Sequence, residues 1–117
     1  MSNKLPDINY QEFFLWILRR RKRFRVTGNS MQPLLQPGEE VVINPDAYKK
    51  ALPQVNDVVV AIHPSKESLE IVKRISSISE DGKFFLLGDN LDCSTDSRSF
   101  GTVSLENIVG KVTSRFN

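Results

Sequence analysis

Apolar residues near the N-terminus recur with the period of an α-helix. They fall at positions i, i+3, i+4, i+7 and i+8 of one face: Tyr10, Phe13, Phe14, Ile17 and Leu18. Asn9 precedes them and can cap the helix, with Glu12 at its third position. The apolar stretch over residues 13–18 is shorter than the roughly 20 residues that cross a bilayer, and no small-residue cleavage site follows it. We therefore expect an amphipathic helix, neither a transmembrane anchor nor a secretory signal, and a cytoplasmic location.

From residue 24 onward the pattern changes to that of short β-strands separated by turns. β-Branched and aromatic residues gather in six segments: residues 24–27, 40–43, 57–62, 69–78, 83–87 and 108–115. Asp81-Gly82 lies between two of these segments and is a strong signal for a hairpin turn. Several short strands in a small chain indicate a mainly β fold, a small coiled antiparallel β-sheet with the one N-terminal amphipathic helix.

The length of 117 residues is enough for one domain, and no linker-like segment divides it. We expect a single domain over residues 1–117, with the N-terminal helix and basic run in 1–22 and the β core in 23–117. The basic run continues past residue 22 into the β core. It consists of Arg19, Arg20, Arg21, Lys22, Arg23 and Arg25. Outside it acidic residues outnumber basic ones, so the basic character is confined to one patch.

Cys93 is the only cysteine and His63 the only histidine. One residue of each type can form neither a disulfide within the chain nor a structural zinc site. We expect His63 to be a solvated residue at a strand end and Cys93 to be an ordinary small residue of a polar loop. No metal and no cofactor are expected.

Three segments hold the residues that could carry chemistry. Ser30 lies in a tight turn that Gly28 permits. Lys73 alternates with Ile71 and Ile75, which places its side chain on the apolar side of a strand. A glycine-bounded polar run over residues 88–101, here termed the closing loop, follows the strand expected at 83–87. We expect Ser30 to be exposed at its turn.

A serine hydroxyl becomes a good nucleophile only when a base removes its proton, and a lysine can be that base only when its amine is neutral. Lowering the pKa of a lysine from about 10.4 to about 7 destabilises the ammonium by roughly 4–5 kcal/mol, which burial can supply. Taken singly, Ser30 is an ordinary turn serine and Lys73 a strand lysine whose head reaches water. The ordered set of three segments favours a catalytic interpretation.

The set resembles the catalytic boxes of the signal peptidase I family of Ser/Lys proteases. The matching segments are Gly-x-Ser-Met-x-Pro at 28–33, Val-Lys-Arg at 72–74 and Gly-Asp-Asn-(x)3-Ser-x-Asp-Ser-Arg-x-Phe-Gly at 88–101. The resemblance implies that Ser30 is the nucleophile, that its backbone N–H contributes to an oxyanion hole, and that Lys73 is the general base. It also implies that Ser94 orients the lysine amine and that Asp96 and Arg98 form an ion pair that braces the closing loop.

Some positions depart from the family pattern. Leu34 stands where threonine usually follows the proline, and Gly28 stands where some members supply a serine hydroxyl to the oxyanion hole. The second oxyanion donor is therefore open. Only a short hairpin separates Lys73 from Gly88, so we expect the extra β-domain of larger bacterial leader peptidases to be absent.

The short length and the Arg-Phe-Arg-Val segment before the serine box resemble one branch of this family, the proteases that mature nickel-type superoxide dismutases. This resemblance implies a serine endopeptidase that removes an N-terminal propeptide in trans, with the nickel superoxide dismutase precursor as its partner. The nickel then belongs to the substrate.

Three alternatives remain. The chain could be a general signal-peptidase-like processing protease. A self-cleaving repressor-type protease needs a bond such as Ala-Gly in its own arm, and the chain has no Ala-Gly. A non-catalytic β module could instead dock on an anionic membrane or an acidic partner through Phe13, Trp16 and the basic run. For the helix itself, we favour packing of its apolar face on the β core.

Overall fold

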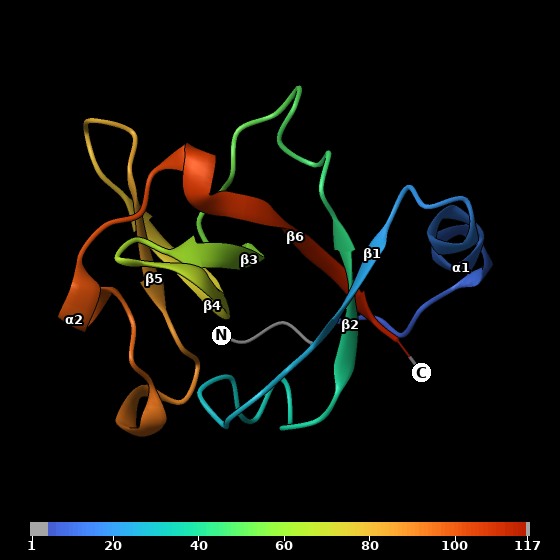
Figure 1. Cartoon of the computed structure of the whole chain (residues 1–117), viewed down its shortest axis with the longest axis horizontal. Coiled ribbons are helices and arrows are strands. Elements are labelled where there is room, and N and C mark those ends of the chain that lie inside the picture. Colours follow the sequence, from blue (N-terminus) through green and yellow to red (C-terminus); the bar gives the residue numbers. More distant parts are fainter. Residues whose placement is uncertain (1–4, 117) are drawn as a thin grey trace.

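The computed structural model describes residues 5–116 and is mainly β, as the sequence predicts. Six strands form one open antiparallel sheet in the order β1-β2-β6-β3-β4-β5. Figure 1 shows a strongly twisted sheet in which β6 runs across the molecule and joins β2 on one side to β3 on the other. The strands are β1 Lys22–Arg25, β2 Glu40–Asn44, β3 Val58–His63, β4 Lys66–Ile78, β5 Phe84–Leu87 and β6 Ile108–Arg115. The helices are α1 Tyr10–Ile17 and the short α2 Ser97–Phe100, with 3-10 turns at Leu91–Cys93 and Leu105–Asn107.

The predicted strands all form, and their bounds differ by a few residues. β1 begins inside the basic run because it pairs with β2, where Glu40 accepts hydrogen bonds from both Arg23 and Arg25. The attraction between these opposite charges on neighbouring strands favours that register. The expected hairpin turn is present between β4 and β5, where Gly82 has a φ of +79°.

Apolar side chains pack on both faces of the central strand β3. Its residues alternate between two clusters, with Val58 and Val60 in one and Val59 and Ala61 in the other. A strand buried on both faces needs a continuous apolar run, which is the pattern of residues 58–62. The flanking strand β4 is thereby held against a rigid core, with Lys73 opposite Val59 in the register.

Helix α1 forms as predicted, with the Asn9 side chain accepting a hydrogen bond from the Glu12 N–H at 2.8 Å. Its expected packing on the core is wrong. None of its residues is buried, and the apolar face that the sequence assigned to the core is exposed to solvent. The helix attaches through its other side, where Trp16 packs edge-on against Phe116 with 4.8 Å between ring centroids.

The expectation for His63 is also wrong. The side chain is buried at the end of β3 and lies 4.6 Å from the ring of Phe100, measured between centroids. Its Nδ1 accepts a hydrogen bond from the Ser65 N–H. Phe100 comes from α2, so a residue distant in the sequence packs on the imidazole that a plain strand end would leave in water.

Across residues 5–116 no helix has both the length and the apolar character needed to cross a bilayer.

Candidate active site

Ser30 lies in the turn that follows β1. Gly28 has a φ of +72°, a left-handed conformation that glycine adopts without strain. Two hydrogen bonds tie this turn to the closing loop, since the Asn90 N–H donates to the Ser30 carbonyl at 2.8 Å and its side-chain amide donates to the Asn29 carbonyl at 3.0 Å. Ser30 is half-buried, not fully exposed as its turn position predicted, because the closing loop covers one side of it.

Lys73 reaches Ser30 from the middle of β4. The Lys73 amine donates a hydrogen bond to the Ser30 hydroxyl with 2.7 Å between Nζ and Oγ, although the residues are far apart in the sequence. Only 5% of the Lys73 surface is exposed. Burial lowers the pKa of Lys73, and the negative charge of Asp96 opposes this shift in part. The arrangement is therefore a serine hydroxyl in contact with a desolvated amine whose neutral form is favoured.

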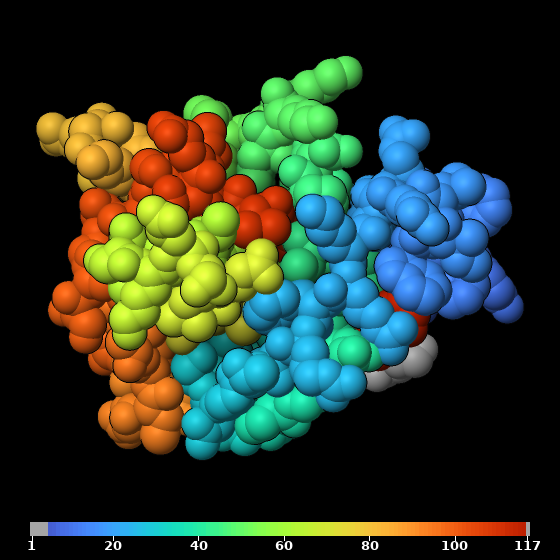
Figure 2. All heavy atoms as spheres, viewed as in Figure 1, coloured from blue at the N-terminus to red at the C-terminus, as the bar shows by residue number. Residues whose placement is uncertain are grey.

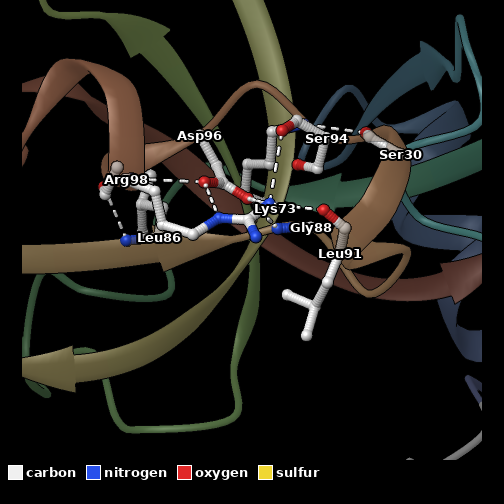
Figure 3. A network of polar contacts seen from close by, with 9 residues as sticks. Ser30, Lys73, Leu86, Gly88, Leu91, Ser94, Asp96 and Arg98 are labelled. Carbon is white, nitrogen blue, oxygen red and sulfur yellow. Dashed lines mark hydrogen bonds and ion pairs between the residues drawn. The ribbon is translucent and has the colours of Figure 1, made fainter.

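Asp96 lies close to this pair and acts on the Lys73 amine through its negative charge. Figure 3 shows Asp96, Arg98 and Ser94 from the closing loop gathered around Lys73. The Asp96 carboxylate accepts from Arg98 Nε at 2.9 Å, from Arg98 Nη2 at 3.1 Å and from the Gly88 N–H at 3.0 Å. Burial alone would raise the pKa of Asp96, but these hydrogen bonds outweigh it and lower the pKa to about 2. Asp96 is thus ionised at neutral pH.

The ion pair between Asp96 and Arg98 is asymmetric. Asp96 is 1% exposed, whereas Arg98 is half-exposed and also donates to the Leu91 carbonyl at 2.7 Å. Asp96 additionally caps the short helix α2 through the Arg98 N–H. The guanidinium and the carboxylate together hold both ends of the turn from Leu91 to Arg98.

We expect Asp96→Ala to lower the free energy of unfolding by about 3 kcal/mol, because it removes a helix cap and the acceptor of several buried hydrogen bonds. The stabilisation from Asp96 should be complete above about pH 4, the range of its unfolded pKa, and fade as the pH falls toward 2. Denaturant unfolding at several pH values measures both effects. Thr95→Ala, at an exposed neighbour, should unfold like the wild type, and a coupling near zero between Asp96→Ala and Arg98→Ala would contradict the bracing role.

Ser94 and Gly88 approach each other closely beside Ser30 and Lys73 (Figure 3). A Cβ added at Gly88 would lie 2.2 Å from the Ser94 Oγ and 2.6 Å from the Ser30 carbonyl oxygen, so only glycine fits there. The Ser94 hydroxyl lies near enough to Asp96 to help lower the pKa of that carboxyl. It has no hydrogen bond of ordinary geometry within the described part of the chain. A buried hydroxyl without such a partner is free to turn toward a neutral Lys73 amine.

For Ser94→Ala we expect a rate loss of about tenfold, the effect of one lost hydrogen bond of roughly 1.4 kcal/mol in the transition state. The stability should change little, since the hydroxyl makes no firm hydrogen bond in the resting protein. Steady-state cleavage of a peptide substrate measures the rate. A rate equal to that of the wild type, or as low as that of Ser30→Ala, would contradict an orienting role.

A second ion pair at the site, between Arg74 and Asp89, was not predicted from the sequence. Arg74 donates to both carboxylate oxygens of Asp89, from Nε at 2.8 Å and from Nη2 at 2.9 Å, and both side chains are mostly buried. Hydrogen bonding to Asp89 raises the pKa of Arg74 despite its burial. The signal was present, because both residues lie inside the matched motifs, directly after Lys73 and Gly88. The pair ties β4 to the start of the closing loop.

A small cleft opens beside the Ser30 hydroxyl. Its volume is about 90 Å³, and it is lined by Phe24, Thr27, Ser30 and residues 69–73 of β4. β5 pairs only with the stretch of β4 from Arg74 to Ile78, so among residues 5–116 no strand covers this edge of residues 69–73. The Ser30 N–H likewise has no acceptor among the described residues.

Comparisons with known proteins agree on one family. The family described as signal peptidase, peptidase S26, matches residues 13–81 and 77–117. Signal peptidase IB of Staphylococcus aureus is 26% identical over 147 aligned positions, which cover 80% of this chain and 76% of the relative. Subunit 2 of the mitochondrial inner membrane protease of Mus musculus is 31% identical over 102 positions, covering 69% of this chain and 58% of the relative.

The family match spans all three segments that carry Ser30, Lys73 and the closing loop. In the structure, the serine turn and β4 line one cleft, and the closing loop contacts the serine turn through Asn90. The chain belongs to the signal peptidase (peptidase S26) family and is accordingly a serine peptidase that acts on precursor proteins.

Proposed function

We propose that the chain is an endopeptidase with a Ser/Lys dyad, in which Ser30 is the nucleophile and Lys73 the general base. The observation that carries this proposal is the contact of 2.7 Å between Lys73 Nζ and Ser30 Oγ, with the amine buried. A neutral amine at this distance accepts the proton of the hydroxyl as the oxygen attacks. Burial lowers the pKa of Lys73 and so favours the neutral form that a base requires.

The reaction divides into two acyl transfers. Ser30 Oγ attacks the scissile carbonyl carbon, and its proton passes to Lys73 Nζ. The negative charge that forms on the carbonyl oxygen is stabilised by the Ser30 N–H, which is free to donate. Lys73 then returns the proton to the leaving amine, which leaves an ester on Ser30. Water, deprotonated by the same amine, attacks the ester and releases the new carboxylate and the free serine.

The open edge of β4 supports an extended substrate. A peptide can add to residues 69–73 as a further strand, with its backbone amides paired to those of β4. The small cleft lined by Phe24 and Thr27 admits only a short side chain beside Ser30. The site therefore favours an unfolded segment with a small residue before the cleaved bond, as an N-terminal propeptide can provide.

The substrate that we propose is the precursor of a nickel superoxide dismutase, cleaved in trans in the cytoplasm. This choice rests on the resemblance of the Arg-Phe-Arg-Val segment and the serine box that follows it to the maturation proteases. Nickel is part of that substrate, and the protease needs no metal for the steps above. General signal-peptidase-like processing is the second candidate, and the relatives named signal peptidase support it. Membrane contact is a separate question, because α1 contributes no residue to the cleft.

Incubation with purified precursors distinguishes the two candidates. The chain is mixed with a nickel superoxide dismutase precursor and, separately, with a secretory preprotein, and the N-termini of the products are sequenced. Cleavage at the propeptide junction of the first alone supports the maturation role. Cleavage of the preprotein alone supports general processing. If the enzyme hydrolyses a test peptide but cleaves neither precursor, both proposed substrates are rejected. A Ser30→Ala sample identifies any contaminating protease.

A further inference from the structure

The apolar face of α1 points away from the rest of the molecule. It consists of Tyr10, Phe13, Phe14, Ile17 and Leu18, all of them exposed. Tyr10 is 91% and Phe14 61% accessible. Figure 2 shows this segment, in dark blue, as a projection at one end of the molecule, apart from the orange closing loop. A hollow of about 450 Å³, lined in part by Ile8 and Asn9, adjoins Tyr10 and Phe13. Five neighbouring exposed apolar side chains form the kind of patch that marks a binding surface.

The opposite side of the helix fixes this orientation. Glu12 accepts hydrogen bonds from Arg21 Nε at 3.2 Å and from the Thr113 hydroxyl of β6 at 2.5 Å. The Arg23 guanidinium lies 3.9 Å from the centre of the Phe116 ring, against which Trp16 also packs. These contacts attach α1 to the sheet and the C-terminal segment through the side that carries Glu12 and Trp16. The apolar face is exposed because it lies on the opposite side of the helix.

Cations that make no ion pair with residues 5–116 lie next to this face. Within the basic run, Arg21 pairs with Glu12, and Arg23 and Arg25 pair with Glu40. Arg19, Arg20 and Lys22 are exposed and make no ion pair with any described residue. Arg19 and Arg20 follow Leu18 directly. Arg19 and Arg20 therefore border the exposed apolar patch without an ion pair among residues 5–116, and Lys22 follows at the start of β1.

We propose that α1 docks this protein on the surface of a membrane that contains anionic lipid. The apolar face enters the boundary between headgroups and acyl chains, and Arg19, Arg20 and Lys22 contact the lipid phosphates. An anionic lipid surface complements both the apolar face and the neighbouring cations, whereas the same face of a second copy carries the same cations. Tyr10 at the patch and Trp16 beside it are residue types that prefer the membrane interface.

Vesicle sedimentation tests the proposal with the intact chain. We expect binding to vesicles of equimolar phosphatidylcholine and phosphatidylglycerol, little binding to phosphatidylcholine alone, and weaker binding at high salt. The double variant Phe14→Ser/Ile17→Ser should lose binding. The double variant Arg19→Gln/Arg20→Gln should weaken it by about 25-fold, since each basic residue contributes roughly fivefold near an anionic surface. Trp16, the only tryptophan, lies 5.7 Å from Phe13 of the patch between ring centroids, so a change in its fluorescence on addition of vesicles reports on contact of lipid with α1.

Control variants lie on another exposed region. Lys50→Gln and Leu52→Ser remove a cation and an exposed apolar side chain far from α1 in the sequence, and should bind vesicles like the wild type. Equal binding to both vesicle types, no binding to either, or loss of binding in the controls would overturn the proposal. So would dimerisation that Phe14→Ser/Ile17→Ser abolishes. All these variants should hydrolyse a soluble peptide at the same rate. Failure of the membrane proposal can therefore be distinguished from failure of the protease proposal.

Discussion

Ser30→Ala is expected to reduce peptide cleavage by about a thousandfold or more, because it removes the only nucleophile in contact with Lys73 among the described residues. The hydroxyl is half-buried and makes a single hydrogen bond, so the free energy of unfolding should change by less than about 1 kcal/mol. Cleavage is followed by mass spectrometry of a defined precursor, and stability by denaturant unfolding of the same samples.

Ser99→Ala is the matched control, since Ser99 is an exposed serine of the closing loop outside the cleft. It should retain wild-type activity. A Ser30→Ala enzyme that keeps more than about a tenth of the activity would reject Ser30 as the nucleophile, because removal of a covalent nucleophile costs orders of magnitude.

Lys73→Met is expected to inactivate the enzyme to a similar extent. Methionine keeps the apolar stem in the strand and removes the amine that takes the serine proton. The substitution also removes a desolvated polar group, so the variant should be at least as stable as the wild type near neutral pH. Lys66→Met, at an exposed position of the same strand, should be fully active. Activity in Lys73→Met would exclude Lys73 as the base.

The pH dependence of the wild type gives a second measurement on Lys73. Since burial lowers the pKa of Lys73 in the folded state, the unfolded chain binds more protons between the folded and unfolded pKa values. The stability contributed by this residue should therefore rise with pH across that interval, up to about 10.4, and the rise should be absent from Lys73→Met. The cleavage rate should rise on a pKa below that of a free lysine. A rate that increases only near 10.4 would contradict a buried base.

Much of the fold was predictable because it depends on local pattern. Strand alternation and the Asp81-Gly82 turn located the β segments, and the turn chemistry placed Gly28 and Gly82 where the chain has positive φ. The helix start was equally local, since Asn9 caps it through the Glu12 N–H. The candidate site could be predicted from the sequence for a different reason. Its residues lie in three motifs of fixed spacing, and resemblance to a family identifies such motifs without any knowledge of the fold.

Other features depend on contacts between segments that are distant in the sequence. The pairing of Arg74 with Asp89 was not predictable, because no local pattern indicates that strand β4 and the closing loop meet there. His63 packs against Phe100 of α2, which is distant in the sequence, and alternation in β3 cannot predict that contact.

The orientation of α1 shows the same limit most clearly. The sequence by itself determined that an amphipathic helix forms, because period and capping are properties of neighbouring residues. Only the tertiary structure decided which face meets the sheet. Trp16, Glu12 and their partners on β1, β6 and the C-terminal segment bind one side of the helix, and their contacts outweigh the preference of the apolar face for burial. In the same way, sequence placed Lys73 on the apolar side of a strand, but the 2.7 Å contact with Ser30 exists because the sheet coils and the closing loop holds the serine turn against it.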